Sequence, residues 1–269
     1  MPQKGEEINR KSQKTMRLTI KIGSNVLTRQ DGSLDVTRMS ALVDQIANLR
    51  SQGHEVILVS SGAVASGRSE LKHIQHDLDS VDQRQLFSAV GQAKLINRYF
   101  ELFREYGIAV GQVLTTKENF SDTEHRKNQE NCMKVMLENN VLPIVNENDT
   151  VSVTELMFTD NDELSGLMAR MTQSQMLIIL SNIDGIYTGD PADPASQLIR
   201  SIEPGKRLDE YIQEKKSSAG RGGMQSKSNV AIQTAAAGIS VIIANGKRDD
   251  ILVKLMNDRE NTPCTEFLC

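Results

Sequence analysis

Short apolar runs rich in β-branched residues alternate with longer amphipathic stretches along most of this chain, and this alternation constrains the fold more than any other feature. We predict strands over residues 18–22, 55–60, 108–114, 141–145, 176–181 and 239–244. Apolar residues recur at helical spacing between them, over residues 39–50, 86–104, 131–137 and 230–237. Because strands that alternate with helices build βαβ units, the sequence predicts an α/β fold, a three-layer α/β/α sandwich with a mostly parallel central sheet.

Length and composition limit the organisation and the partners of the chain. With 269 residues, 38% of them apolar, it can bury one large core. We expect residues 1–15, which are mostly polar, to form a flexible N-terminal tail, and residues 16–269 to form one domain. A net charge of −4 disfavours nucleic acid and anionic membranes as partners.

The cysteine content and the hydropathy favour a cytoplasmic protein. The three cysteines are an odd number without CxxC spacing, which suits a reducing compartment better than a disulfide framework. The polar N-terminus has no apolar signal segment, and no run approaches the roughly 18 apolar residues that span a bilayer. We therefore expect a cytoplasmic location and no membrane association.

The ends of the predicted strands are where a site is expected, because ligands of parallel sheets bind outside the carboxyl ends of the strands. Four strands are followed by residues capable of chemistry, at positions 21–25, 60–67, 146–150 and 181–185. Because all four are expected at one edge of the sheet, together they indicate a binding site more strongly than any one motif does.

Lys21 and the segment 60–67 both suit an anion. Lys21 lies in an apolar strand and must reach water or a negative charge; an edge lysine that extends to solvent is the alternative. Gly62 and Ala63 open a helix whose free N–H groups suit a carboxylate or a phosphate, whereas Ser61 could serve as a simple N-cap. Residues 62–69 nearly match a P-loop, but Arg68 stands where that motif needs lysine, so we reject that interpretation.

A glycine-rich stretch, GRGGM at residues 220–224, precedes Lys227 and a helical pattern. Backbone amides of such a loop, together with a lysine near a helix start, can hold phosphate groups. A surface loop with a solvated lysine is the alternative. The stretch lacks the last glycine of a dinucleotide-binding fingerprint.

Two polar clusters, NEND at 146–149 and DNDE at 160–163, lie close together after the strand predicted at 141–145. Alternating acceptors and amide donors in the first cluster suit a small zwitterion, and Asn161 can add donors. Asp162 is suited to hold two lysines through charge-assisted hydrogen bonds. The alternatives are an Asx-turn in the first cluster and N-capping of the following helix by Asp160.

No resident metal site is predicted. The DNDE cluster lacks the glycine and the spaced glutamate of a calcium-binding loop. The histidines at 54, 73, 76 and 125 have no partners at ligand spacing, so we expect them at solvated positions.

The motifs KIGSNVLT, VSSGAVASGR, VGQ, GQVLTT, PIVNENDTV, DNDELS, DGIYTGDP and GGMQSK occur in this order between residues 18 and 267. In this combination the sequence resembles the amino acid kinase family, most closely its members that phosphorylate the γ-carboxylate of L-glutamate. The resemblance implies ATP-dependent formation of glutamyl 5-phosphate, the first step of proline biosynthesis. It also implies Mg²⁺ held mainly by the nucleotide phosphates.

The resemblance assigns roles residue by residue. It implies that Lys21 contacts the ATP phosphates, that Lys227 approaches the transferred phosphoryl group, and that Asp162 orients both lysines. The acceptor would be bound in the N-terminal half by Ser61, Gly62, Ala63, Asn146, Asp149 and Asn161. The nucleotide would be bound in the C-terminal half by Lys21, Ser181, Asn182, Arg221, Gly222, Gly223, Met224, Gln225, Ser226 and Lys227.

The sequence departs from the family pattern on the nucleotide side. Members often carry Thr-Asp where this chain has Ser181 and Asn182, and Gly-Thr-Gly-Gly where it has GRGG at 220–223. Many continue into a C-terminal PUA domain, whereas this sequence stops just after TEFLC. Feedback inhibition by proline and assembly into dimers or tetramers are further expectations of the family.

Two other functions are compatible with the sequence. The acceptor could be another carboxylate or a nucleotide, as in the acetylglutamate, aspartate and uridylate kinases of the same family. The protein could instead be a non-catalytic amino-acid sensor, although the presence of both Lys21 and Lys227 disfavours this.

Overall fold

The computed structural model describes residues 15–71, 77–152, 158, 160–205 and 223–269. Within them, eight strands form one sheet in the order β3-β4-β2-β1-β5-β9-β10-β8, and β6 pairs with β7 separately. The strands are β1 Arg17–Ile22, β2 Glu55–Ser60, β3 Val110–Thr115, β4 Leu142–Glu147, β5 Met176–Ser181, β6 Ile186–Tyr187, β7 Leu198–Ile199, β8 Ser201–Ile202, β9 Ser240–Asn245 and β10 Cys264–Phe267. All pairings from β3 to β9 are parallel, and β10 runs antiparallel to β9. The predicted mostly parallel sheet is confirmed.

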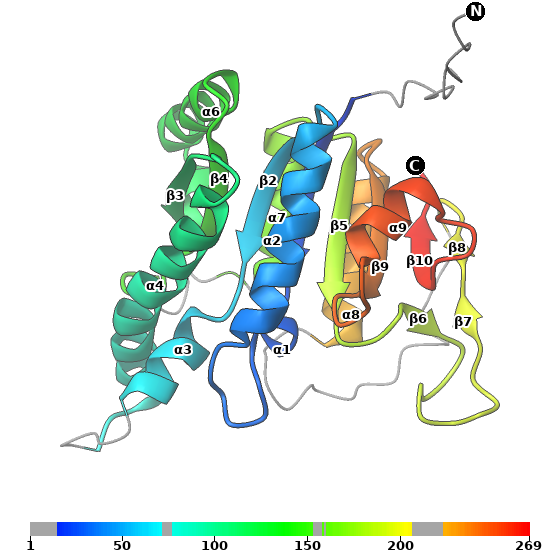
Figure 1. Cartoon of the computed structure of the whole chain (residues 1–269), viewed down its shortest axis with the longest axis horizontal. Helices are drawn as coiled ribbons and strands as arrows, with labels where there is room; N and C mark the ends of the chain where they lie inside the picture. The colour runs from blue at the N-terminus through cyan, green and yellow to red at the C-terminus, as the bar shows by residue number, and fades with distance from the viewer. Residues whose placement is uncertain (1–14, 72–76, 153–157, 159, 206–222) are drawn as a thin grey trace, which may run out of the picture.

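Helices cover both faces of this sheet, which confirms the three-layer sandwich (Figure 1). One face packs against α2, α4 and α9, and the other against α6, α7 and α8. The helices are α1 Ser24–Leu27, α2 Val36–Ser51, α3 Ala63–Glu70, α4 Ser80–Arg104, α5 Glu118–Ser121, α6 Thr123–Glu138, α7 Asn161–Met171, α8 Met224–Ala235 and α9 Ile251–Asn257. None of the helices in the described ranges is long and apolar enough to span a bilayer.

The period of two along β1 decides which side chains reach the site. Leu18, Ile20 and Ile22 point to the core beneath α2. Thr19 and Lys21 point to the opposite face, where Thr19 Oγ1 lies 2.8 Å from Ser174 Oγ. Since β1 lies in the middle of the sheet between β2 and β5, Lys21 is buried and faces α7 rather than solvent.

Several helices and strands begin or end at other residues than predicted, because tertiary contacts extend them. Helix α4 begins at Ser80 rather than near residue 86, because Asp79 caps it by accepting hydrogen bonds from two backbone N–H groups. Strand β4 continues to Glu147, since its ladder with β3 does not stop at residue 145. Helix α8 begins at Met224, which places Lys227 in its first turn.

The histidine prediction is wrong for His54. This side chain is only 4% exposed, and its Nδ1 accepts a hydrogen bond from the backbone N–H of Met16 at 3.1 Å. Burial lowers the pKa of His54, so the neutral ring is favoured. His125 is exposed on α6, whereas residues 73 and 76 lie outside the described residues, as does most of the predicted N-terminal tail.

Candidate active site

The carboxyl ends of the parallel strands meet at one edge of the sheet, the lower edge in Figure 1. Each of the central strands delivers polar or flexible residues there: Gly23 after β1, Ser61 after β2, Asn148 and Asp149 after β4, Asn182 after β5 and Gly246 after β9. Backbone hydrogen bonds tie these ends together, because Gly23 N–H donates to the Leu180 carbonyl at 3.1 Å and Gly246 N–H to the Ser181 carbonyl at 2.8 Å. The strand-end loops therefore share one surface.

Two lysines and one aspartate form the charged centre of this edge. The Asp162 carboxylate lies 2.6 Å from Lys21 Nζ and 2.9 Å from Lys227 Nζ. All three side chains are buried, and that of Asp162 is 1% exposed. Burial opposes ionisation of Asp162, but the two ammonium groups outweigh it and hold its pKa below the ordinary value. Lys21, Lys227 and Asp162 together carry one net positive charge, and two ammonium groups side by side suit phosphate groups.

Asp160 joins the two helices that carry this centre. One of its oxygens caps α7 by accepting from the N–H groups of Asp162 and Glu163 at 2.8 and 3.0 Å. Its other oxygen accepts from Ser226 Oγ at 2.6 Å, in the first turn of α8 beside Lys227. Burial and then the charge of Asp162 raise the pKa of Asp160. The N-cap considered for Asp160 from the sequence is thus present, and it coexists with the lysine contacts of Asp162.

The N-terminus of α3 provides free backbone donors. Gly62 is the N-cap, with φ of 106°, and no side chain caps the helix, so Ser61 is not the N-cap. Positive φ is readily adopted only by glycine, which explains the residue type. Arg68 lies in the last turn of α3 with its guanidinium 5.4 Å from the centre of the Phe87 ring, away from this N-terminus. The rejected P-loop interpretation thus has no support in the geometry.

Glycines in α3 and α4 set the position of that N-terminus. A Cβ atom on Gly91 would lie 1.8 Å from the Ala63 carbonyl oxygen, and one on Gly67 would lie 1.8 Å from that of Phe87. The two helices therefore approach more closely than any other residue allows. Gly91 belongs to the VGQ motif, whose glycine thus acts by placing Ala63.

A network of amide side chains connects the acceptor residues named from the sequence. Asn161 Nδ2 donates to Ser61 Oγ and to Asn146 Oδ1, both at 2.9 Å. Asn146 Nδ2 in turn donates to Gln92 Oε1 at 2.8 Å. Asn161 Oδ1 is buried without a hydrogen-bond partner among the described residues. This network brings together the ends of β2 and β4, the start of α7 and the middle of α4.

Arg84, on α4, contacts the two carboxylates of the NEND cluster and was missed by sequence reasoning. Its Nη2 lies 2.6 Å from Glu147 Oε2, and the same guanidinium pairs with Asp149. Glu147 Oε1 accepts from Ser152 Oγ at 2.8 Å and from the backbone N–H of Phe158 at 3.0 Å. Helical spacing could have indicated that Arg84 faces the protein interior, because it lies one turn before Ser88 on the buried face of α4.

The residues named for the nucleotide are more dispersed. Ser181 is buried at the end of β5, Asn182 is exposed, and Gly223 to Lys227 form the N-cap and first turn of α8. Residues 221 and 222 lie outside the described residues. Sequence reasoning missed Arg248, whose two nitrogens bind Asp184 at 2.6 and 2.7 Å. Hydrogen bonds from Arg248 lower the pKa of Asp184 and connect the loops after β5 and β9.

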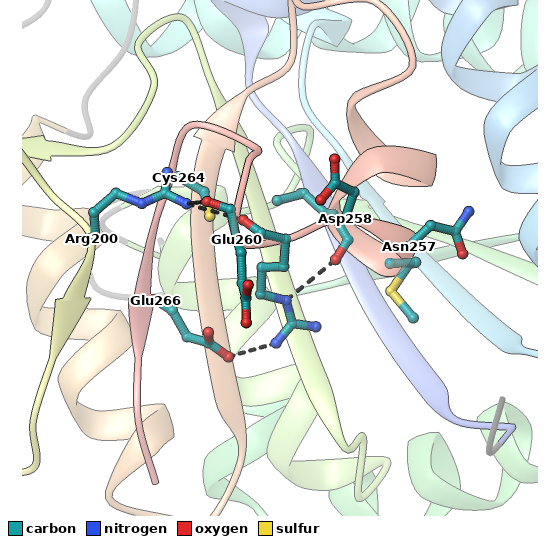
Figure 2. Close-up of a pocket in the computed structure, with 9 residues that line it drawn as sticks. Arg200, Asn257, Asp258, Glu260, Cys264 and Glu266 are labelled. Carbon is teal, nitrogen blue, oxygen red and sulfur yellow. Dashed lines mark hydrogen bonds and ion pairs between the residues drawn. The ribbon is translucent and has the colours of Figure 1, made fainter. Parts of the chain in front are cut away.

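A hollow that is separate from these residues, shown in Figure 2, lies against α9 and β10. Arg200 donates to the backbone carbonyls of Arg259, Glu260 and Thr262, and Arg259 Nη1 lies 2.6 Å from Glu266 Oε1. Burial raises the pKa of the Cys264 thiol. Both arginines are engaged in holding the connection from α9 to β10, so we interpret this hollow as structural.

The parallel sheet and the paired lysines at its strand ends define a phosphotransferase architecture, and comparison with known proteins identifies it. The model of the amino acid kinase family matches residues 16–245, and the chain belongs to this family. The chain is 71% identical to the glutamate 5-kinase of Bacteroides thetaiotaomicron over 95% of its own length and 71% of that protein. It is 46% identical to the glutamate 5-kinase of Chlorobaculum tepidum over 88% of its length and 65% of that protein.

The fold is also that of more distant solved structures. Carbamate kinase from Giardia lamblia bound to AMP-PNP aligns with a TM-score of 0.66 over 94% of this chain and 98% of that chain. The two sequences are 16% identical, so the likeness concerns the fold alone.

Proposed function

We propose that this chain uses the Lys21–Asp162–Lys227 centre to transfer the γ-phosphoryl group of ATP to the γ-carboxylate of L-glutamate. The activity itself, that of a glutamate 5-kinase in the first step of proline biosynthesis, follows from the family and from the relative at 71% identity. The observation that supports these roles is the buried carboxylate holding two ammonium groups at the strand ends, next to the amide network.

The chemical step needs positioning and charge neutralisation rather than a general base. The γ-carboxylate of glutamate is already ionised at neutral pH and can attack directly. Its oxygen forms a bond to the γ-phosphorus in line, the bond from that phosphorus to the bridging oxygen breaks, and ADP leaves. Lys21 and Lys227 stabilise the charge on the phosphate oxygens, and Asp162 fixes both ammonium groups in place.

The acceptor side supplies complementary groups for an amino acid. We assign the backbone N–H groups of Gly62 and Ala63 to the reacting carboxylate, because they open α3 without a side-chain cap. Asp149 and Asn161, helped by Asn146, are assigned to the substrate's amino and carboxyl groups, with the Asp149 carboxylate and the open Asn161 Oδ1 suited to the α-ammonium group. The buried, unpartnered Asn161 Oδ1 is one acceptor that the ligand would satisfy.

Mg²⁺ fits this centre as a companion of the nucleotide. Both carboxylates beside the lysines are engaged, Asp162 with the lysines and Asp160 with α7 and Ser226. The described residues contain no cluster of three or more potential metal ligands. This donor set suits an ion carried mainly by the phosphates, which would supply further neutralisation of their charge.

Assembly, regulation and location complete the proposal. A homo-oligomer, either a dimer or a tetramer, is supported by exposed apolar side chains such as Phe100 on α4, and light scattering would test it.

Feedback inhibition by proline is supported by an acceptor side whose assigned residues suit α-amino and α-carboxyl groups. Adding proline to the assay would test it. The cytoplasm suits the three free cysteines.

An acceptor panel tests the proposed function. ADP release from MgATP would be measured with L-glutamate, N-acetylglutamate, aspartate or UMP, with hydroxylamine present to trap an acyl phosphate as the hydroxamate. We expect hydroxamate with L-glutamate alone. Turnover with another acceptor would assign the chain a different substrate of the amino acid kinase family. Glutamate binding without ADP release would favour a non-catalytic amino-acid sensor.

A further inference from the structure

Arg84 occupies a place that the assigned roles do not explain. It lies near the start of α4, outside the strand-end loops, yet its side chain is only 14% exposed. Its guanidinium contacts both Glu147 and Asp149, the last strand residue and the first loop carboxylate of the NEND cluster. A buried arginine shared by two carboxylates is held by charge-assisted hydrogen bonds, which are stronger and more directional than neutral ones.

The net charge of Arg84, Glu147 and Asp149 is complementary to one ammonium group. Glu147 and Asp149 are both buried, with 6% and 9% of their side chains exposed, and Arg84 compensates one of their two negative charges. Together, Arg84, Glu147 and Asp149 carry a net charge of −1, which is complementary to an ammonium group. Without Arg84 the two buried carboxylates would repel one another, and at least one would turn away or take up a proton.

The connections of Glu147 explain how Arg84 fixes Asp149. Glu147 is anchored by Ser152 and by the backbone N–H of Phe158, so its carboxylate cannot turn freely. Arg84 transmits that fixed position to Asp149, which lies at the start of the loop. The adjacent Gln85 adds a hydrogen bond of 2.7 Å to the Thr150 carbonyl, so α4 holds the loop at two successive residues.

We propose that Arg84 is a positioning residue that aims the Asp149 carboxylate at the substrate's α-ammonium group and thereby selects acceptors with a free amino group. The inference rests on the proposed function, in which Asp149 binds that group. Arg84 itself would touch neither the phosphates nor the reacting carboxylate. Its loss should therefore affect the choice of acceptor much more than the use of ATP.

Glutarate provides the appropriate probe, because it has both carboxylates of glutamate and no amino group. The measurement is kcat/KM for glutamate and for glutarate, with the KM for ATP, in the wild type, Arg84→Gln and Arg84→Lys. We expect Arg84→Gln to lower the preference for glutamate over glutarate by about tenfold or more, mainly through the KM for glutamate. The KM for ATP should change by less than about threefold. Arg84→Lys keeps the charge but not the planar guanidinium whose Nη2 contacts both carboxylates, so its preference should lie between those of the other two enzymes.

Arg98→Gln is the matched control, since Arg98 lies on the same helix in an exposed ion pair with Glu101 and should leave the preference unchanged. An Arg84→Gln enzyme that loses activity equally with both acceptors, or keeps the wild-type preference, would overturn the inference. If Arg84→Gln does not fold, Arg84→Lys decides, because an unchanged preference overturns the inference and a reduced one supports it. A wild type that releases no ADP with glutamate would contradict the proposed function itself.

Discussion

The acceptor side and the nucleotide side of this site are built in different ways. On the acceptor side, Asn161 donates to Ser61 and Asn146, and Asn146 donates to Gln92, so the ends of β2 and β4 are joined to α7 and α4. Asn146 is buried and the other three residues are half-buried. On the nucleotide side, Asn182 is exposed and the contacts between loops rest on an exposed arginine, Arg248, and on Asp184. Under the proposed roles, this difference indicates that side-chain hydrogen bonds fix the geometry where a small amino acid is distinguished, whereas charged side chains bind the phosphate groups.

The centre shared by both sides should be the most sensitive to change. Under the proposed function, Lys227→Ala removes one of the two ammonium groups assigned to the phosphate oxygens, and we expect kcat to fall by about 10²–10³-fold, or roughly 3–4 kcal/mol of transition-state stabilisation. The KM for ATP should change much less. Steady-state kinetics would check this, with the exposed Lys134→Ala on α6 as the control. A turnover close to that of the wild type would remove Lys227 from its assigned role.

Glutamate binding should weaken when a substitution forces α3 and α4 apart. Gly91→Ala places a methyl group against the Ala63 carbonyl, and we expect a loss of about 1–3 kcal/mol in the free energy of unfolding. Because α3 must shift, the KM for glutamate should rise more than the KM for ATP. Chemical denaturation and kinetics would measure both effects. Asn97→Ala, at an exposed position of the same helix, should have neither, and an unaffected Gly91→Ala would show that the close approach is not required.

Asp160 connects α7 with the first turn of α8, and substitutions there test this connection between the two sides. Asp160→Ala removes the cap of α7 and the acceptor for Ser226, and should cost about 1 kcal/mol of stability. Asp160→Asn keeps a capping oxygen but removes the charge beside Asp162. Since the pKa of Asp160 is raised in the folded protein, its ionisation destabilises the fold as the pH rises above the ordinary value of 3.8.

The stability of Asp160→Asn relative to the wild type should therefore increase as the pH is raised from about 4 to 7. Thermal unfolding at a series of pH values would measure this. A difference that is constant or decreases over that range would contradict the raised pKa. The lowered pKa of Asp162 acts in the opposite sense, because its ion pairs stabilise the fold above 3.8 and are lost as the pH falls below it.

The smallest effect is expected on the exposed part of the nucleotide side. Asn182→Ala removes an exposed side chain, so the free energy of unfolding should stay within about 0.5 kcal/mol of the wild type. We expect the KM for ATP to rise by less than about fivefold, with kcat and the KM for glutamate unchanged. A large loss of glutamate affinity would show that the two sides are not separate.

The sequence predicts that residues at several strand ends lie close together, and the structure confirms this grouping for a physical reason. Residues at successive strand ends become neighbours in any parallel sheet, so Lys21, Ser61 and Asn146 can be grouped before the fold is known. Arg84 and Gln92 could not be grouped with them, because they reach the site from α4, whose close approach to α3 depends on Gly67 and Gly91. His54 was mispredicted because the burial of a residue just before a strand depends on the chain that packs over it.

The most direct test of phosphoryl transfer uses L-glutamate labelled with ¹⁸O in the γ-carboxylate. If a carboxylate oxygen attacks the γ-phosphorus, it becomes the bridging oxygen of the acyl phosphate, and hydroxylamine attack at the carbonyl carbon then releases it with the phosphate. The account predicts one ¹⁸O atom in each phosphate released during hydroxamate formation, measured by mass spectrometry. Unlabelled phosphate would mean that water attacks ATP, and it would contradict the assignment of the γ-carboxylate as the acceptor.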